Sequence, residues 1–479
     1  MSDDLKEILK AVYVACLFLG FAPALGFLTR GSRKSQRILF FLMVFLPMCP
    51  HSKVMVTPGF MPGYNGHTWG YETSYMEVLA LALLFAGRGP SVVRGPWLPP
   101  GSWLWLLYCF AASLSLFNTA SLNVSMFAVY KFTKAVVVLM ATFHHLREEE
   151  DLHHMLVCFA ITLGIQALVC LDERYRLHMY QVPGWFEHQN SLVMYSYMLA
   201  LPLLGAGLGP VTLRRALIYL SGFCAGGVCV MASLSRAGML AFMVGISAVV
   251  ALSFLDRPTA RRFAIVGVFA VIGSLALLLA AKTIINRLHD SGNVASKEVR
   301  EMLNADSRQM LKDHPIIGTG WNTYAIMINP PYHYGDNFDD WEIARGHSIN
   351  RKDPHSISES WYYLLLAETG LVGTGAMFLF FLTTLTWCFL CLLKFRRTFI
   401  GAISIGIFAG LGMIYLQSNY ERVLAQPKTL VAWLILIGTV SRFEWWRRHG
   451  LPQRRIRQVT AGGQRFVPPP AIAVRRAGR

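Results

Sequence analysis

Charged side chains are scarce in this chain. Asp, Glu, Lys and Arg make up only 15% of its 479 residues, whereas 54% are hydrophobic, and the mean hydropathy is +0.43. A soluble protein of this length carries far more charge, because charged side chains cover its surface. The shortage excludes a soluble enzyme and predicts a chain that lies mostly in a membrane.

The signatures of common cofactor and metal sites are also missing. The sequence contains no P-loop, GxGxxG or HExxH motif, and Asp339 and Asp340 are adjacent rather than spaced as a metal-binding pair. The nine cysteines are odd in number and lie in or beside apolar runs, which indicates that there is no disulfide framework. We therefore expect neither a metal ion nor an organic cofactor.

Long apolar runs, by contrast, recur throughout the chain. Most of them can cross the ~30 Å hydrocarbon core of a bilayer as a helix. Two runs are short, and 360–394 is long enough for a membrane-dipping half-helix followed by a full span. We therefore expect an all-α, polytopic transmembrane bundle of about 12 to 13 spans. The runs are 9–29, 38–49, 75–87, 102–118, 126–144, 153–171, 191–208, 215–234, 237–255, 262–283, 360–394, 399–418 and 428–441.

Basic side chains fall in alternate connections between these runs. Lys and Arg are enriched on the cytoplasmic side, so these connections are expected there, with the N-terminus outside unless one short run is re-entrant. No small-residue cleavage pattern follows the first run, which predicts a retained helix. From Arg442 onward the tail holds 10 Arg and one Glu, which indicates contact with anionic lipid rather than nucleic acid. The basic segments are 30–37, 88–94, 214–215, 257–262, 394–397 and the tail.

The opposite, extracytoplasmic face collects polar and aromatic residues. They lie in the segments 50–74, 172–190 and 233–236 and in a long connection from about 284 to 357. The length of this connection and its helical signal near 294–313 predict a small folded lid. The predicted organisation has four parts: 1–283 with ten transmembrane helices, 284–357 as a partly helical extracytoplasmic loop, 358–441 with the C-terminal transmembrane helices, and 442–479 as a disordered basic cytoplasmic tail.

Polar residues at the boundary of apolar runs are the first candidates for function. Arg236 stands between two such runs. An arginine at the membrane boundary is costly unless it is paired or hydrated, so Arg236 is a functional candidate, with an arginine that snorkels to the interface as the alternative. Gln189 and Asn190 precede the run 191–208. Their amides could orient a sugar or a diphosphate, or only cap the helix.

Two further arginines lie on the helix expected at 296–312. Arg300 and Arg308 are eight residues apart, which places them on one face. A guanidinium binds phosphate oxygens through two parallel hydrogen bonds and stays charged at physiological pH. The alternative is that both form ordinary surface ion pairs with acidic residues of the same helix.

A histidine and a carboxylate precede the run 360–394. His355 and Glu359 are spaced i, i+4, so a helix that begins near Ser356 would place them on one face. Either side chain could remove a proton from a hydroxyl if partial burial tuned its pKa toward neutrality. The alternative is a capping box formed by Ser356 and Glu359.

Four stretches follow one another in the second half of the chain: Glu187-His-Gln-Asn-Ser-Leu192 with Leu201-Pro202, Ser233-Leu-Ser-Arg-Ala-Gly238, Arg300 with Asp313-His-Pro-Ile-Ile-Gly-Thr-Gly320, and Leu364-Leu-Leu-Ala-Glu-Thr-Gly-Leu-Val-Gly373. Together with the large extracytoplasmic loop, they resemble the O-antigen ligase and Wzy-type O-antigen polymerase superfamily of bacterial envelope enzymes. The resemblance covers roughly residues 150–420, and the N-terminal third adds only hydropathy.

The chain departs from the family pattern at one position. The family has a histidine 11 residues before the first glycine of its GLxG ending, and the corresponding residue, counted back from Gly370, is Glu359. His355 lies one helical turn earlier. Either Glu359 replaces the histidine as general base, or His355 reaches the site across an altered turn, and both alternatives stay open.

The resemblance implies a metal-independent, GT-C-like membrane glycosyltransferase of the bacterial inner membrane, with its site on the periplasmic side. The implied donor is an oligosaccharide linked to undecaprenyl diphosphate, and the implied acceptor is a sugar hydroxyl that attacks with inversion. Other envelope polysaccharide assembly proteins are candidate partners. The implied roles are diphosphate binding by Arg236, Arg300 and Arg308, proton removal by Glu359 or His355, and glycan binding or orientation by Gln189, Asn190, His314, Trp361 and Tyr362.

A polymerase of exopolysaccharide or O-antigen is the favoured activity, and an O-antigen ligase that acts on lipid A core is the alternative. A polysaccharide or lipid transporter is the non-enzymatic rival. Transporters usually contain repeated halves with a site near the bilayer midplane. The two halves of this sequence show no repeat, and the candidate polar residues gather at one face.

Overall fold

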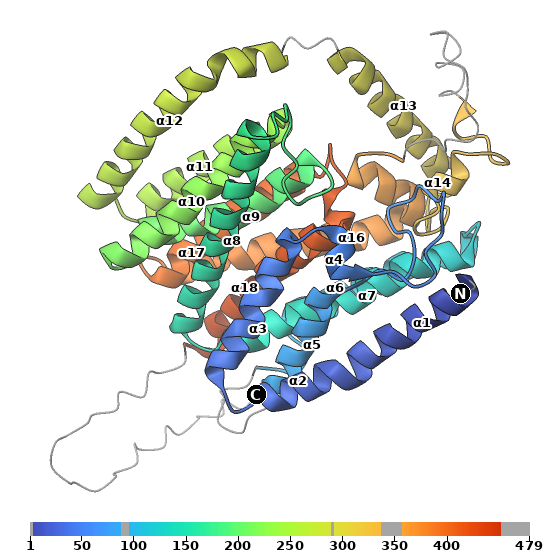
Figure 1. Ribbon diagram of the computed structural model, residues 1–479, viewed down its shortest axis with the longest axis horizontal. Coiled ribbons are helices and arrows are strands. Elements are labelled where there is room, and N and C mark those ends of the chain that lie inside the picture. The colour runs from blue at the N-terminus through green and yellow to red at the C-terminus, as the bar shows by residue number, and fades with distance from the viewer. Residues whose placement is uncertain (1–2, 88–94, 289–291, 337–356, 452–479) are drawn as a thin grey trace, which may run out of the picture.

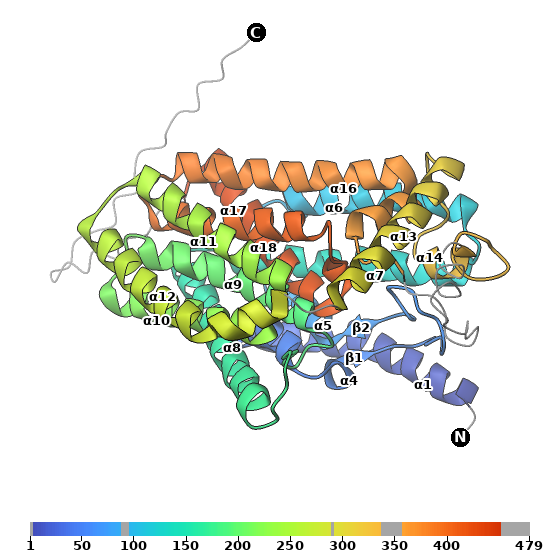
Figure 2. The same ribbon diagram turned by 90° about the horizontal axis from the view of Figure 1, so that it is seen from above.

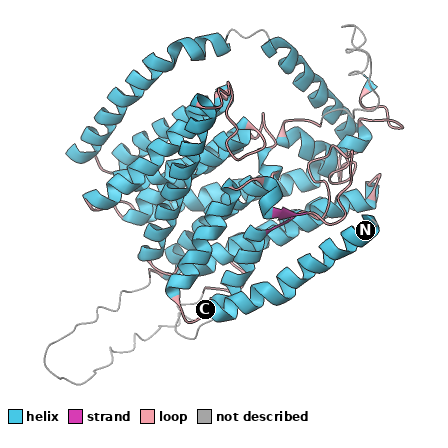
Figure 3. Ribbon diagram, viewed as in Figure 1, coloured by secondary structure: helices cyan, strands magenta, loops and turns pink. Residues whose placement is uncertain are grey.

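The computed structural model is a bundle of helices, and it describes residues 3–87, 95–288, 292–336 and 357–451 (Figure 1). Within these residues the only sheet is a two-stranded ribbon (Figure 3), in which Met55 pairs with Ser74. The strands are β1 (Met55–Val56) and β2 (Thr73–Ser74). The helices are α1 (Asp3–Cys16), η1 (Leu17–Phe21), α2 (Ala22–Thr29), α3 (Arg33–Phe45), η2 (Leu46–Met48), α4 (His51–Val54), α5 (Tyr75–Ala86), α6 (Pro100–Ser113), η3 (Leu114–Asn118), α7 (Leu122–His145), α8 (Glu149–Tyr175), α9 (Gln189–Leu208), α10 (Leu213–Ser233), α11 (Arg236–Asp256), α12 (Ala260–Leu288), α13 (Gly292–Asp313), α14 (Tyr324–Met327), α16 (Trp361–Lys394), α17 (Phe399–Gln417), η4 (Val423–Ala425) and α18 (Pro427–His449).

The predicted all-α, polytopic membrane class is confirmed. Every predicted apolar run corresponds to a helix, and nine helices in the described part of the chain are long and apolar enough to span a membrane. The prediction of 12 to 13 spans exceeds this number partly because α3 and α5 have only 13 and 12 residues. At ~1.5 Å per residue, helices of this length are shorter than the hydrocarbon core.

The basic connections that the structure describes lie together at one end of the bundle, which we call the basic end. The predicted basic segment 88–94 lies outside the described residues. At the basic end, Arg33 of α3 forms an ion pair with Asp151 of α8. The guanidinium of Arg261, at the start of α12, donates to the carbonyl oxygen of Val211 at 2.6 Å. The backbone N–H of Arg397 donates to Asp256 at 3.0 Å. These contacts join connections that are far apart in sequence, as the predicted topology requires.

The opposite end, which we call the polar end, carries the connections 176–188, 234–235, 357–360 and 418–426. Helices α13 and α14 lie at this end beside the beginning of α16 (Figure 2). The backbone N–H of Trp361 donates to the carbonyl oxygen of Ser418 at 2.9 Å, so the start of α16 is fixed to the end of α17. The polar end therefore brings together α9, α13, α16 and the connection before α18.

Helix α16 is broken at Gly370, whose φ of 61° and ψ of −162° are not helical. The segment 315–320 supplies the missing hydrogen-bond partners. The N–H groups of Thr319 and Gly320 donate to the carbonyl oxygens of Ala367 and Glu368, both at 3.0 Å. The N–H of Leu371 donates in return to the carbonyl oxygen of Pro315 at 2.9 Å. A short half-helix therefore precedes a full span, in agreement with the interpretation of the run 360–394.

The predicted start of the basic tail is wrong, because α18 continues through Arg442 to His449. The Arg442 side chain is buried, and its guanidinium lies over the ring of Phe143 at 5.1 Å and that of Trp446 at 5.2 Å. Glu444 is fully buried and forms ion pairs with the arginines that follow it. Aromatic and ionic partners thus extend the helix beyond its apolar run. The remainder of the predicted tail, 452–479, lies outside the described residues.

Candidate functional site

Four polar side chains from four separate elements meet at the polar end, and we call them the outer charge cluster: Asn190, Arg300, Glu359 and Glu421. Nε of Arg300 donates to Oε2 of Glu359 at 2.5 Å, and Nη2 of Arg300 lies 3.5 Å from Oε1 of Glu421. Nδ2 of Asn190 donates to the same oxygen of Glu421 at 2.5 Å. One arginine is therefore shared by two carboxylates, of which the second is also held by an amide.

Local structure explains how these side chains come to this place. His188 is the N-cap of α9, and its Nδ1 accepts the backbone N–H of Asn190 at 3.2 Å. Asn190 therefore lies in the first turn of α9, where its buried amide faces the connection 418–426. Arg300 projects from the middle of α13 toward the segment that precedes α16. The site is therefore formed by the starts of α9 and α16, the connection that follows α17, and one face of α13.

The two carboxylates differ in burial and in their pKa. The Glu359 side chain is 41% exposed, whereas that of Glu421 is 9% exposed. Burial and the negative charge of Glu359 together raise the pKa of Glu421 to about 7, against the opposing effects of Arg300, Asn190 and Arg422. Glu421 therefore titrates near neutral pH, which is the range that suits a general base.

Arg422 brings a second positive charge close to the cluster. Burial lowers the pKa of Arg422, and the charges of Glu359 and Glu421 oppose this effect. Its Nη1 atom is buried and has no hydrogen-bond partner among the described residues. A buried guanidinium nitrogen of this kind can donate a hydrogen bond to an anionic group.

The prediction that Arg300 and Arg308 lie on one face of a helix is confirmed. Both face the beginning of α16, since Nη1 of Arg308 lies 3.5 Å from the hydroxyl of Tyr363 and its guanidinium lies 5.6 Å from the centre of that ring. Arg300 pairs with Glu359, two residues before the helix. The alternative of ion pairs within α13 therefore does not describe either arginine, and their phosphate-binding role stays a prediction.

Arg236 is the first residue of α11 and is exposed. It has no ion pair or hydrogen bond from its side chain to any residue that the structure describes. Gly238, one turn into α11, lies against the side chain of Val193 of α9, so Arg236 belongs to the same end of the bundle as Asn190. The sequence had placed it there from topology alone.

The predicted helix start near Ser356 is wrong. Helix α16 begins at Trp361, and its N-cap is Ser360, whose Oγ accepts the backbone N–H of Tyr363 at 3.4 Å. Glu359 precedes the helix, and the described segment 357–360 is not helical. Ser356, the other residue of the predicted capping box, lies outside the described residues. The sequence Ser360-Trp-Tyr-Tyr363 provides a closer cap, which explains the shift. His355 lies outside the described residues.

The remaining predicted residues are dispersed. Trp361 is 1% exposed and lies against Phe132 and His67, so the structure gives it a packing role rather than the predicted sugar-facing one. The Tyr362 hydroxyl donates to the carbonyl oxygen of Tyr415. His314 follows α13 and is partly exposed, and its carbonyl oxygen accepts the N–H of Gly318 at 3.1 Å. Gln189 begins α9 and is also partly exposed.

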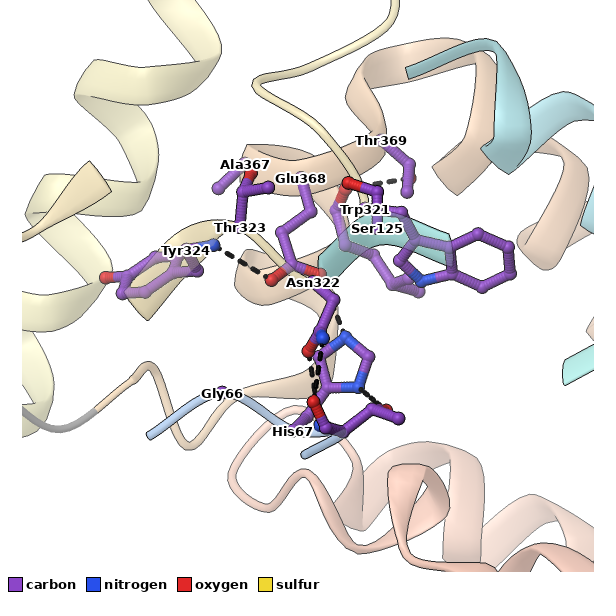
Figure 4. A network of polar contacts seen from close by, with 12 residues as sticks. Gly66, His67, Ser125, Trp321, Asn322, Thr323, Tyr324, Ala367, Glu368 and Thr369 are labelled. Carbon is purple, nitrogen blue, oxygen red and sulfur yellow. Dashed lines mark hydrogen bonds and ion pairs between the residues drawn. The ribbon is translucent and has the colours of Figure 1, made fainter. Parts of the chain in front are cut away.

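A second polar network, which sequence reasoning missed, is buried beneath the break in α16 (Figure 4). Nε2 of His67 lies 3.1 Å from Oε2 of Glu368, and both side chains are 1% exposed. The other carboxylate oxygen of Glu368 accepts the backbone N–H of Tyr324 at 3.2 Å. Asn322 donates to the carbonyl oxygen of Thr68 at 2.9 Å. The network fixes the segments around 67 and 322 to the half-helix.

Sequence reasoning also missed Glu421 and Arg422. The available signal was an adjacent acid and base in a short connection between the runs 399–418 and 428–441, on the predicted extracytoplasmic face. The same kind of signal had identified Arg236. Among the described residues, no group of three or more His, Cys, Asp or Glu side chains could hold a metal ion.

Comparison with known protein families gives a match over part of the chain. Residues 221–378 match a family described as O-antigen ligase (Wzy_C). No curated protein matches the chain. The matched segment runs from α10 into α16 and contains Arg236, Arg300, Glu359 and the break at Gly370, whereas Asn190 and Glu421 lie outside it. Over this segment, which is about a third of the chain, the match supports the resemblance to the superfamily of O-antigen ligases and Wzy-type polymerases.

Proposed function

We propose that the protein is a membrane glycosyltransferase that transfers a glycan from undecaprenyl diphosphate to a hydroxyl of an acceptor sugar at the extracytoplasmic face. The family match supports a ligase- or polymerase-like activity in general. The position of the outer charge cluster at the polar end, opposite the basic end, supports a site on the extracytoplasmic side.

In the proposed reaction, the acceptor oxygen attacks the anomeric carbon of the donor glycan as the bond from that carbon to the diphosphate oxygen breaks. The bonding electrons leave with the diphosphate, and the hydroxyl proton passes to a carboxylate. The leaving group gains negative charge during this step, which nearby guanidinium groups stabilise. Attack from the opposite side inverts the anomeric configuration.

The observation that carries this proposal is the environment of Arg300. Its side chain is 37% exposed, lies at the polar end within the family match, and is paired with carboxylates. A diphosphate can replace Glu359 as the partner of this guanidinium because both present oxygens that accept its paired N–H groups. Arg236, which is exposed at the same end, supplies a second positive charge, and Arg308 a third.

The test is transfer by the purified protein in lipid nanodiscs that contain a synthetic oligosaccharide linked to undecaprenyl diphosphate. We expect the wild type to form product. Arg300→Ala should reduce the rate about 100-fold or more, which is the typical effect in other enzymes of removing one hydrogen-bond donor that stabilises the charge of the transition state. Lys297→Ala is the matched control, since Lys297 lies one turn away on α13 and its side chain is 79% exposed. A wild type that forms no product from this donor would refute the proposal.

The second candidate activity is that of an O-antigen ligase, because the matched family carries this description. Polymerase remains the first candidate activity, and the same assay distinguishes the two. A polymerase extends a second lipid-linked glycan, whereas a ligase requires lipid A core as acceptor. Mass analysis of the product with each acceptor supplied separately decides between them.

A further inference from the structure

The two carboxylates beside Arg300 are bound to it in different ways. Glu359 receives both Nε and Nη2 of the guanidinium on one oxygen, and its side chain is 41% exposed. Glu421 is 3.5 Å from Nη2 and is almost enclosed. Oε2 of Glu359 is therefore occupied by the guanidinium, and the geometry makes this carboxylate the direct counter-ion of Arg300.

Glu421, by contrast, is held mainly by a neutral amide rather than by a close ion pair. Asn190 donates to its Oε1 at 2.5 Å, and this amide fixes the carboxylate to α9. The second oxygen, Oε2, receives no hydrogen bond from any residue that the structure describes. One oxygen is therefore anchored while the other remains available to a hydroxyl of the acceptor.

The charged and titratable groups around Glu421 come from every element packed against it. They are Arg300 from α13, Glu359 from the segment before α16, His188 at the N-cap of α9, Tyr197 from within α9, Arg422 from the same connection, and Lys428 from α18. Lys428 is engaged elsewhere, since its Nζ donates to the carbonyl oxygen of Trp185 at 2.7 Å. Burial and Glu359 raise the pKa of Glu421 to about 7 against Arg300, Asn190 and Arg422.

We infer that Glu421 is the general base of the transfer reaction and that Glu359 is the counter-ion that holds Arg300 until the donor diphosphate binds. This inference rests on the proposed function. The O–H bond of the acceptor breaks as its oxygen bonds to the anomeric carbon. The proton passes to Oε2 of Glu421, and the electrons of the broken glycosidic bond leave on the diphosphate, beside Arg300.

The test compares Glu421→Gln with Glu359→Gln in a single-turnover assay with saturating lipid-linked donor, from about pH 5 to about pH 9. We expect the wild-type rate to fall as the pH drops through the pKa of Glu421, because the protonated carboxyl cannot accept a proton. Glu421→Gln should lower the rate about 100-fold or more and abolish this dependence, as loss of a general base does. Glu359→Gln should keep the dependence and lose less than about tenfold in rate.

Three controls make the result decisive. Glu301→Gln changes an exposed carboxylate on α13 that pairs with Lys297, and it should behave as the wild type. Glu421→Asp keeps a carboxylate, so it should recover part of the rate and retain a pH dependence even if the glutamine variant does not fold. Donor binding by both Glu421 variants should match that of the wild type.

The inference is overturned if Glu421→Gln stays within about threefold of the wild type, or if the rate falls while the pH dependence persists, which indicates only a positioning role. It is also overturned if Glu359→Gln is the variant that abolishes the dependence. A wild type that transfers no glycan refutes the proposed function instead, so the two failures can be told apart.

Discussion

Gly318 and Gly370 lie so close together that a Cβ atom built on either one would be 2.6 Å from the backbone nitrogen of the other. Both have positive φ, 73° for Gly318 and 61° for Gly370. This contact is where the segment 315–320 crosses the break in α16 and completes its hydrogen bonds. Two stretches that carry the family resemblance are therefore halves of one structural joint.

The joint predicts the effect of adding a methyl group. Gly370→Ala should lower the midpoint of thermal unfolding and the rate of glycan transfer, because the new Cβ meets backbone atoms that cannot move aside and the residue adopts a left-handed conformation that costs about 1 kcal/mol or more. Gly318→Ala should act in the same direction. Fluorescence-detected thermal unfolding of the purified protein measures the change.

Gly375→Ala is the matched control for this prediction. Gly375 lies five residues further along α16, and a Cβ built there meets no atom within 4 Å. This variant should be neutral or slightly more stable, since alanine favours a helix by about 1 kcal/mol over glycine. Equal losses in all three variants would show that close approach at the joint is not the cause.

The fold could be predicted from the sequence because the bilayer imposes long apolar helices and the distribution of Lys and Arg orders their ends. The contacts that assemble the site could not. Arg300 and Glu421 are 121 residues apart, and nothing in the local pattern around either one indicates the other. Glu359 was identified by its spacing from Gly370, but its place outside α16 depends on the cap at Ser360. Pairings between distant connections are set by packing, which a single sequence does not display.

The buried pair of His67 and Glu368 predicts a stability effect that is separate from catalysis. Glu368→Ala removes the partner of His67 and of the Tyr324 N–H within a site where both side chains are 1% exposed. Removal of one member of such a buried pair typically costs about 3 to 5 kcal/mol. We expect a large drop in the unfolding midpoint and a smaller drop for Glu368→Gln, which retains hydrogen bonding. If Glu368→Ala unfolds like the wild type, the network does not hold the half-helix.

Asn190 and Glu359 should shift the pH dependence of transfer in opposite directions. The amide of Asn190 stabilises the charged form of Glu421, so Asn190→Ala should raise the pKa of Glu421 and move the acid limb to higher pH. The charge of Glu359 destabilises that form, so Glu359→Gln should lower the pKa and move the limb to lower pH. Rate–pH profiles of the two variants test the signs. Shifts in the same direction would contradict the arrangement of the outer charge cluster.

Glu421 should also reduce the stability of the folded protein at alkaline pH. Its pKa rises from 4.5 to about 7 on folding, so the folded state holds a proton that the unfolded state has already lost between these values. The charged carboxylate therefore costs the folded state free energy that grows as the pH rises from 4.5 and is complete above about 7. A shift of this size corresponds to about 3 kcal/mol.

Glu421→Gln cannot ionise, so its unfolding midpoint should exceed that of the wild type above pH 7 and match it near pH 4. A variant that is less stable than the wild type at alkaline pH would mean that Glu421 stabilises the fold as an ion-pair partner of Arg300, and its assignment as a base held ready by burial would fail.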